Sequence, residues 1–208
     1  MRSALFYGSG VALVTPFSEG RVDLRSFEKL IDWQIDGMTD AIIVLGTTGE
    51  PSTISPTERA GMIECAASAV AGRVPLLVGA GSNNTATAIL YAEQAQSLGA
   101  DGLLIVTPYY NKASRRGLVE HFYAIADSVE IPIIVYNVPS RTGVNLEPAV
   151  AAELLKHPML RGIKEASGDI KQMTELCALC SGAAIYSGND DQTYALMSLG
   201  ARGVISVA

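Results

Sequence analysis

The chain has 208 residues, of which 49% are hydrophobic and 6% aromatic, so it is long enough to bury a substantial core without disulfides or metals. Its formal net charge of −6, with no cluster of basic residues to offset it, argues against a nucleic-acid-binding surface. No apolar run approaches the ~20 residues that cross a bilayer as a helix. We therefore expect a protein that binds neither nucleic acid nor membrane.

The cysteines indicate a reducing, cytoplasmic environment. Cys65, Cys177 and Cys180 are an odd number in a chain without a recognisable secretory signal. The Cys-x-x-Cys spacing of the last two is also found in redox and zinc motifs, but there is no second pair and no nearby histidine, which favours two thiols buried on a helix. His121 and His157 fall on a predicted helix and at a predicted turn, so we interpret both as structural and expect no metal site.

Strands and helices are predicted to alternate along the chain. Short runs rich in Val, Ile and Leu predict strands at residues 10–14, 41–45, 75–79, 102–106, 132–136, 160–164, 184–187 and 203–207. Between them, apolar residues at helical spacing predict helices at residues 24–35, 56–71, 85–98, 116–128, 147–156, 170–180 and 192–199. Ser55, Pro56 and Glu58 have the order of a capping box with a first-turn proline.

Eight parallel strands that each need a crossover helix favour a (β/α)8 TIM barrel over an open doubly wound sheet, which more often has five or six strands. We expect residues 1–208 to form this single domain. The eighth predicted strand is followed only by Ala208, so the barrel is expected to be truncated there and to expose apolar strand and helix surface, unless a neighbouring chain covers it.

Lys164 is the strongest catalytic candidate, because it lies at the end of an apolar run that predicts a strand leading to the barrel mouth. An amine withdrawn from water has a lowered pKa, and a neutral lysine is a nucleophile toward carbonyl groups. The alternative is a lysine whose stem packs on the strand while its amine reaches solvent.

Other polar residues follow the predicted strands at the same end of the barrel, where the catalytic groups of such barrels come together. Thr47 and Thr48 stand between glycines in a segment that either binds a small carboxylate through its N–H and hydroxyl groups or forms a simple turn. Tyr109 and Tyr110 follow the fourth strand, and their phenols either relay protons or pack.

Tyr136 emerges from the fifth strand, and Arg141 follows on what we expect to be a rigid loop. A guanidinium at this place either grips a carboxylate with two hydrogen bonds or is only solvated. Gly188, after the seventh strand, either approaches a ligand closely or belongs to a helix cap.

Lys164, Tyr136, Thr47 and Arg141 are thus predicted to share one barrel mouth. A neutral lysine, proton-relaying hydroxyls and anion-binding donors are the groups that a Schiff-base enzyme acting on a 2-oxo acid needs. This convergence carries more weight than any single motif.

Several motifs together resemble the dihydrodipicolinate synthase family, in order and over the whole chain. They are Gly-Thr-Thr-Gly-Glu at 46–50, Thr-Pro-Tyr-Tyr at 107–110, Tyr-Asn-Val-Pro-Ser-Arg-Thr-Gly at 136–143, Gly-Ile-Lys-Glu-Ala at 162–166 and Gly-Val-Ile-Ser-Val at 203–207. The resemblance implies a cofactor-free lyase of the lysine and diaminopimelate biosynthetic route. In such an enzyme pyruvate forms an imine with Lys164, tautomerises to an enamine and attacks aspartate semialdehyde, giving 4-hydroxy-tetrahydrodipicolinate.

The resemblance also implies a role for each site residue. Tyr136 would transfer protons, with Thr47 linking its hydroxyl to that of Tyr110 from the adjacent subunit of a dimer. The remaining implied roles are substrate contacts: Thr48 with Thr47 at the pyruvate carboxylate, Arg141 at the semialdehyde carboxylate, and Gly188 and Ile205 as pocket lining. The implied assembly is a homotetramer built from tight dimers.

Two features depart from the family pattern. Lysine-inhibited members bind lysine at the dimer interface, and this chain has Pro56, Arg59 and Thr87 where ligand-like side chains are expected, although Ser52, Asn83 and Tyr109 are kept. We therefore do not expect inhibition by lysine. The family also has a last barrel helix and a C-terminal helical segment, and neither is in this sequence.

Two other functions remain open from the sequence. One is a sister lyase with the same lysine and tyrosine, such as N-acetylneuraminate lyase or a 2-keto-3-deoxy sugar acid aldolase; Arg141 favours the synthase, because it suits a short second carboxylate better than a polyol. The other is a catalytically silent barrel that binds a 2-oxo acid.

Overall fold

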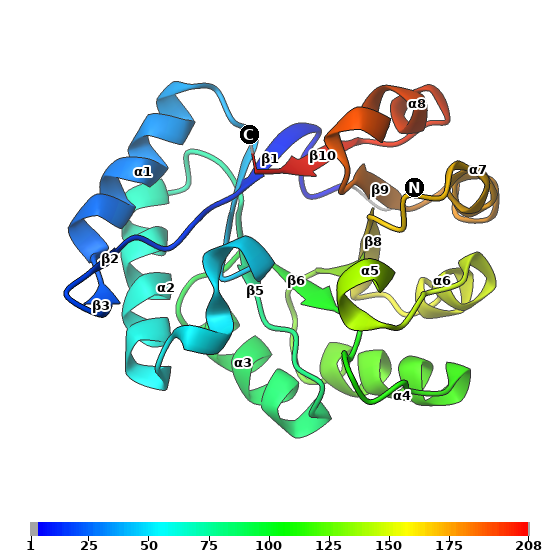
Figure 1. Cartoon of the computed structure of the whole chain (residues 1–208), viewed down its shortest axis with the longest axis horizontal. Coiled ribbons are helices and arrows are strands. Elements are labelled where there is room, and N and C mark those ends of the chain that lie inside the picture. The colour runs from blue at the N-terminus through cyan, green and yellow to red at the C-terminus, as the bar shows by residue number, and fades with distance from the viewer. Residues whose placement is uncertain (1–3, 208) are drawn as a thin grey trace.

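The apolar runs of the sequence form the eight parallel strands of a closed barrel, and helices surround it (Figure 1). This computed structural model describes residues 4–207. The barrel strands are β1 (Gly8–Ala12), β4 (Ala41–Val44), β5 (Leu76–Gly79), β6 (Gly102–Val106), β7 (Ile133–Asn137), β8 (Leu160–Glu165), β9 (Ala184–Ser187) and β10 (Gly203–Ser206). Each strand pairs with the next around the barrel, and β10 closes the ring on β1. The prediction of a (β/α)8 barrel is confirmed.

All predicted helices are present. They are α1 (Leu24–Asp36), α2 (Pro56–Val70), α3 (Thr85–Ser97), α4 (Arg115–Ala126), α6 (Pro148–Leu154), α7 (Ile170–Leu179) and α8 (Thr193–Ser198). The predicted capping box is also present, since Ser55 and Glu58 exchange side-chain to backbone hydrogen bonds at the start of α2. As expected, Cys177 on α7 and Cys180 just after it are buried free thiols.

Several predicted elements begin or end at slightly different residues in the structure, and the first strand and the helix predicted at 147–156 show why. The first strand lies two residues earlier than the predicted 10–14, because its pairing with β10 begins at Gly8, while Val14 is already exposed. The predicted helix 147–156 is shorter as α6, because the last residues turn back with hydrogen bonds such as that from the Lys156 N–H to the Glu153 carbonyl oxygen.

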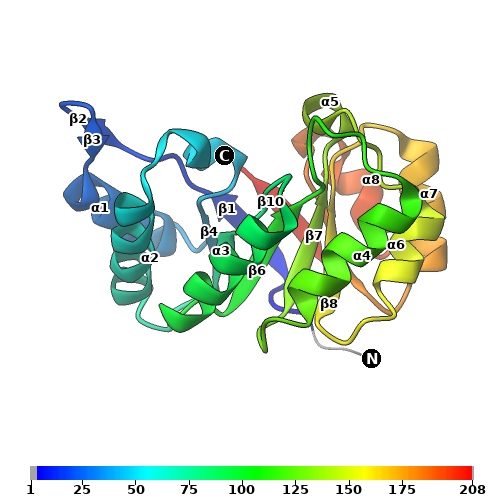
Figure 2. The ribbon, with the colours of Figure 1, turned by 90° about the horizontal axis from the view of Figure 1, so that it is seen from below.

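Several short elements near the barrel mouth were not predicted. They are the hairpin of β2 (Phe17–Ser18) and β3 (Arg21–Val22), the 3-10 turns η1 (Thr47–Gly49), η2 (Pro51–Thr53) and η3 (Asp190–Gln192), and the short helix α5 (Pro139–Thr142). Such segments are too short to show a hydrophobic period. Arg141 therefore lies on a helical turn, and the predicted loop at this position is wrong. Figure 2 shows the hairpin and α5 at the same end of the barrel.

The core has two layers. One lies between the strands and the helices, and the other fills the barrel interior. In the interior, the ring of Phe6 stacks on Tyr186 at 4.4 Å, and the Tyr186 hydroxyl donates to the Phe6 carbonyl oxygen at 2.8 Å. Both side chains are buried and belong to the packed interior of the barrel.

The ring of helices is open between α8 and α1, beside β1 and β10 (Figure 1). Among residues 4–207, no helix follows β10 to cover this side. Met197 and Leu199, near the end of α8, and Val207, after β10, are exposed. These exposed apolar side chains lie on α8 and just after β10, while Val11, Ala12 and Ile205 in the two strands are buried.

Gly203 is required for closing the barrel, because a Cβ at this position would overlap the carbonyl oxygen of Gly8 on β1. We predict that Gly203→Ala destabilises the protein by about 3 kcal/mol or more, since the backbones of two paired strands would have to separate. Gly200→Ala is the matched control: its φ is +99°, but no atom lies within 4 Å of an added Cβ, so it should cost only about 1 kcal/mol. Urea unfolding of both variants checks this, and equal losses would contradict it.

Candidate active site

Three titratable side chains lie in one row across neighbouring strands. In the register of the sheet, Tyr136 on β7 pairs with Lys164 on β8, which pairs with Tyr186 on β9. Residues paired in this way point to the same face of the sheet, and alternate residues along a strand point to opposite faces. Because Tyr136 and Tyr186 belong to the interior core, Lys164 also points into the barrel.

Lys164 is enclosed on several sides and is only 6% exposed. Its Nζ lies 4.5 Å from the centroid of the Tyr136 ring. A Cβ on Gly188 would lie 3.0 Å from Lys164 Cε, so the residue after β9 must be small for this side chain to fit. The same Cβ would lie 2.7 Å from Ala166 Cβ, so in this structure Gly188 closely approaches side chains of the protein, and the predicted close approach to a ligand stays a prediction.

Burial lowers the pKa of Lys164 to about 8. Removal of the amine from water is the largest cause; the Asp190 carboxylate opposes the change and the Arg141 guanidinium adds to it. About a tenth of the amine is then neutral at pH 7, far more than for a lysine in water. The alternative in which the amine reaches solvent is excluded by its burial.

Tyr136 connects Lys164 with Thr47. Its side chain is buried, which raises the pKa of the phenol, while the Arg141 charge and a hydrogen bond with Thr47 lower it. The Thr47 side chain comes from η1 after β4, on the opposite part of the barrel mouth. Tyr136 thus contacts the Lys164 amine through the face of its ring and Thr47 through its hydroxyl.

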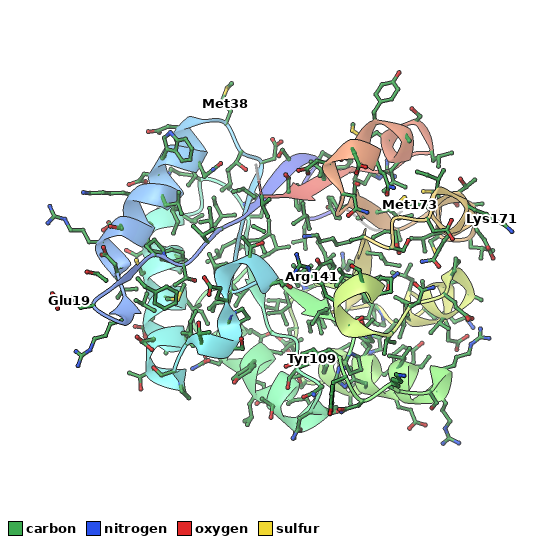
Figure 3. All side chains as sticks on the ribbon, viewed as in Figure 1. Glu19, Met38, Tyr109, Arg141, Lys171 and Met173 are labelled. Atoms are coloured by element: carbon green, nitrogen blue, oxygen red, sulfur yellow. The ribbon has the colours of Figure 1, made fainter. Side chains whose placement is uncertain are left out.

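Arg141 reaches the same centre from α5. Pro139 begins this helix, and Gly143 ends it with φ +71°, a left-handed conformation that glycine adopts without strain. The helix holds Arg141 near the middle of the barrel mouth, while Tyr109 lies closer to the rim (Figure 3). Arg141 is exposed and its charge acts on both Lys164 and Tyr136, so it is available to an anionic ligand.

A cavity of about 460 Å³ opens beside these residues. Thr47, Tyr136 and Arg141 all line it. Of the residues that the structure describes, Lys164 is not part of this lining, and Tyr136 is the side chain that joins it to the cavity. The volume suits a small organic molecule.

The remaining predicted site residues differ in whether they lie at this centre. Ile205 on β10 belongs to the interior core. Thr48 follows Thr47 in η1 and is half-buried. Tyr110 is 88% exposed and has φ +70°, so its side chain points away from the core of its own chain. The structure thus brings together Lys164, Tyr136, Thr47, Arg141 and Gly188, but not Tyr110.

Three nearby polar groups were not predicted as part of the site. The Asp190 carboxylate, on η3, opposes the lowering of the Lys164 pKa. Its position shortly after a predicted strand end is the sequence feature that could have identified it. Glu165 and Asn137 are buried directly beside Lys164 and Tyr136 in the chain. Strand alternation places both side chains on the outer face of the strands, under the helices. This pattern could have identified them from the sequence as two polar side chains inside the protein.

Arg59 also lines the cavity and is buried. Its Nη2 donates to the Gly79 carbonyl oxygen at 2.8 Å, and its guanidinium lies 4.2 Å from the Tyr91 ring centroid. Burial lowers the pKa of Arg59 to about 10. The guanidinium therefore remains charged at neutral pH.

The two histidines have local partners. His121 on α4 contacts the Thr85 hydroxyl at 2.9 Å, and His157 contacts the Asp127 carboxylate at 3.0 Å. Within residues 4–207 there is no group of three or more His, Cys, Asp or Glu side chains able to hold a metal ion. Over the same range, none of the helices has the length and apolar character of a membrane span.

Comparison with known proteins gives one consistent result. The model of the dihydrodipicolinate synthetase family matches residues 5–208. A 4-hydroxy-tetrahydrodipicolinate synthase from Caldicellulosiruptor bescii is 55% identical over 205 residues, which are 98% of this chain and 70% of the relative. The chain is thus similar to these synthases along nearly all of its length and spans about 70% of theirs.

Solved structures agree. Dihydrodipicolinate synthase from Thermotoga maritima has a TM-score of 0.95 and 43% identity, covering 98% of this chain and 71% of its own. The chloride-inhibited synthase from Acinetobacter baumannii, complexed with pyruvate, has a TM-score of 0.94 and 46% identity, covering 97% of this chain and 70% of its own.

We predict that Lys164→Met makes the protein more stable at pH 7. Because burial lowers the pKa of Lys164 from 10.5 to about 8, the charged amine costs the folded state about 3 kcal/mol. Below pH 8 the amine is charged in both folded and unfolded chains, so the gain from Met is complete. Between the folded pKa near 8 and the unfolded pKa near 10.5, the native protein releases its proton on folding, and the gain shrinks.

Urea unfolding of native and variant protein from pH 7 to pH 10.5 measures this difference. Lys171→Met, at an exposed lysine on α7, should leave stability almost unchanged. A Lys164→Met variant that is less stable than the native protein at pH 7 would contradict the prediction.

Proposed function

Because this chain belongs to the dihydrodipicolinate synthetase family, we propose that it condenses pyruvate with aspartate semialdehyde to form 4-hydroxy-tetrahydrodipicolinate, with Lys164 as the imine-forming residue. The observation that carries the proposal is the buried Lys164 amine, with a pKa near 8 and Tyr136 against it. This is the state in which a lysine attacks a carbonyl carbon.

The covalent steps balance without an added oxidant or reductant. Neutral Lys164 adds to C2 of pyruvate, and loss of water gives the imine. Loss of a proton from C3 gives an enamine, which forms a carbon–carbon bond with the aldehyde carbon of the second substrate. The amino group of that substrate then attacks C2, which closes the ring and frees Lys164. One water is released overall, and no cofactor takes part in the reaction as written.

Tyr136 is the proton carrier in this proposal. Its hydroxyl donates a proton to the oxygen that leaves C2 as water, the resulting phenolate takes the proton that C3 loses, and the hydroxyl then donates it to the oxygen of the aldehyde. The proton released by the attacking amino group during ring closure returns to Tyr136. Thr47 hydrogen-bonds with this phenol from across the barrel mouth. That contact supports a relay that returns the proton to Tyr136 between steps.

We assign the carboxylate of each substrate to the residues that lie in a suitable position at the barrel mouth. Thr47 and Thr48, on the turn after β4, hold the pyruvate carboxylate, while Gly188 and Ile205 shape the space around Lys164. Arg141 holds the semialdehyde carboxylate, which is supported by its exposure at the cavity and its electrostatic action on Tyr136 and Lys164.

We further propose that the protein forms a dimer of dimers in which Tyr110 completes the proton relay of the adjacent subunit. The phenol is 88% exposed and its backbone has φ +70°, which is unfavourable for tyrosine. Contact with the adjacent subunit would bury the exposed phenol and hold the backbone of Tyr110 in this conformation. The three free cysteines fit a cytoplasmic enzyme.

Lysine is not expected to inhibit this protein. Arg59 stands at one of the positions where the family resemblance implies a ligand-like side chain of a lysine site at the dimer interface, and its guanidinium is charged. It would repel the ammonium group of that ligand.

The first test is chemical trapping. Incubation with pyruvate followed by borohydride should add one reduced pyruvate to the protein, and peptide mass spectrometry should place it on Lys164. Lys164→Ala should give no adduct, whereas Lys171→Ala, at an exposed lysine, should react like the native protein. No adduct on the native chain would mean that the barrel is catalytically silent.

The second test concerns the second substrate. Arg141→Met should lower kcat/KM for aspartate semialdehyde by about 100-fold, as expected for the loss of a bidentate charged contact of 2–3 kcal/mol. Trapping of pyruvate should remain, because the imine forms before this contact. Coupled assays of native and variant protein measure both. Activity confined to cleavage of sialic acid or a 2-keto-3-deoxy sugar acid would contradict the proposal and identify a sister aldolase.

A further inference from the structure

Glu165 is a buried carboxylate directly after Lys164, and it is only 1% exposed. Because alternate residues of a strand point to opposite faces, its side chain leaves the barrel on the helix side. The same holds for Asn137, which follows Tyr136 and has no exposed surface. A polar pair therefore lies just behind the two residues proposed to carry out the chemistry.

The two side chains bind each other across neighbouring strands. Asn137 Nδ2 donates to both carboxylate oxygens of Glu165, at 3.2 and 3.0 Å. The Ser167 N–H donates to the same carboxylate at 2.7 Å. Within residues 4–207, no lysine, arginine or histidine lies within 4 Å of it as an ion pair. Hydrogen bonds alone thus offset the removal of this group from water.

The network continues into the outer layer. The Leu146 N–H donates to Asn137 Oδ1 at 2.9 Å, and Asn137 Nδ2 also donates to Asn145 Oδ1 at 3.1 Å. Asn145 and Gln172 exchange hydrogen bonds at 2.7 and 3.1 Å. Gln172 comes from α7, so the network joins β7, β8, the loop after α5 and helix α7.

Backbone pairing also connects Asn137 and Glu165 with the residues of the site. Asn137 pairs with Glu165 in the register of β7 and β8, one position beyond the pair of Tyr136 and Lys164. The Glu165 carbonyl oxygen accepts from the Gly188 N–H at 2.8 Å, and Gly188 is the residue that approaches Lys164 Cε. A shift of the network would move Tyr136, Lys164 and Gly188 relative to one another.

We propose that Glu165 and Asn137 are positioning residues, which lock the ends of β7 and β8 so that the Lys164 amine stays dry and against Tyr136. The pair does not line the cavity, so it acts through Lys164 and Tyr136 and not on the substrate. This inference rests on the proposed function in one respect: the reaction whose rate the pair affects is the proposed condensation.

The test exchanges the two polar groups. Asn137→Asp places two carboxylates face to face, and Glu165→Gln places two amides face to face. The double variant Asn137→Asp/Glu165→Gln again has one carboxylate and one amide, with acceptors still available to the N–H groups of Leu146 and Ser167. Asp101→Asn is the control, because Asp101 accepts from the Leu76 N–H at 2.8 Å at the opposite end of the barrel.

Two measurements are made on every variant. The first is the pH profile of reductive methylation at Lys164, followed by peptide mass spectrometry, which needs no substrate. The second is steady-state condensation with pyruvate and aspartate semialdehyde. Thermal unfolding of each protein shows how far the fold is affected.

Each single substitution should move the midpoint of Lys164 labelling upward, because a loosened strand end admits water to the amine. Each should lower kcat by about tenfold or more and change KM by less than about threefold. The double variant should regain the native midpoint and a kcat within about threefold of native. Asp101→Asn should lower the unfolding temperature and leave both readouts unchanged.

Three results would overturn the inference: a double variant no better than the single ones, midpoints that stay native while only stability falls, or a midpoint that moves downward in Glu165→Gln. The last would show that Glu165 acts through its charge. If native protein does not react with pyruvate but the labelling midpoint is lost and restored as described, the proposed function fails while the positioning role holds.

Discussion

The site depends on keeping one amine out of water. Lys164 is nearly enclosed by interior side chains of the barrel, and this burial lowers its pKa to about 8. The same burial destabilises the charged form of the residue in the folded chain, at a cost that is a large fraction of the stability of an ordinary domain. The rest of the barrel has to supply enough packing to offset it. The filled interior around Phe6 and Tyr186, with the closure of β10 on β1, provides that packing.

Strand register turns this packing into a site. The alternation of side chains sends Tyr136 and Lys164 inward from paired positions, and it sends the next two residues outward into the helix layer. The inward pair meets Thr47 and Arg141 from other strand ends at the cavity. The outward pair forms a hydrogen-bonded network that needs no cation. One strand pair therefore carries both the reacting groups and the contacts that hold them in place.

Much of this arrangement could be predicted from the sequence. Eight apolar runs with helical segments between them specify a (β/α)8 barrel, and Lys164, Tyr136, Thr47 and Arg141 lie together because the strand ends of a barrel converge. The short turns at the mouth were missed because three or four residues show no hydrophobic period. The role of Gly188 beside Lys164 Cε and the network of Glu165 depend on contacts between strands, and these follow from register, which apolar runs alone do not fix.

The most direct test of this account is the titration of Lys164 itself. NMR of protein labelled with ¹³C at lysine Cε follows each amine through its own midpoint, and the Lys164→Met variant identifies the signal that belongs to this residue. The account predicts a midpoint near 8 for Lys164, well below the value of about 10.4 for a lysine side chain in water. A Lys164 midpoint equal to that of a lysine in water would show that the amine is hydrated, and the central claim would be wrong.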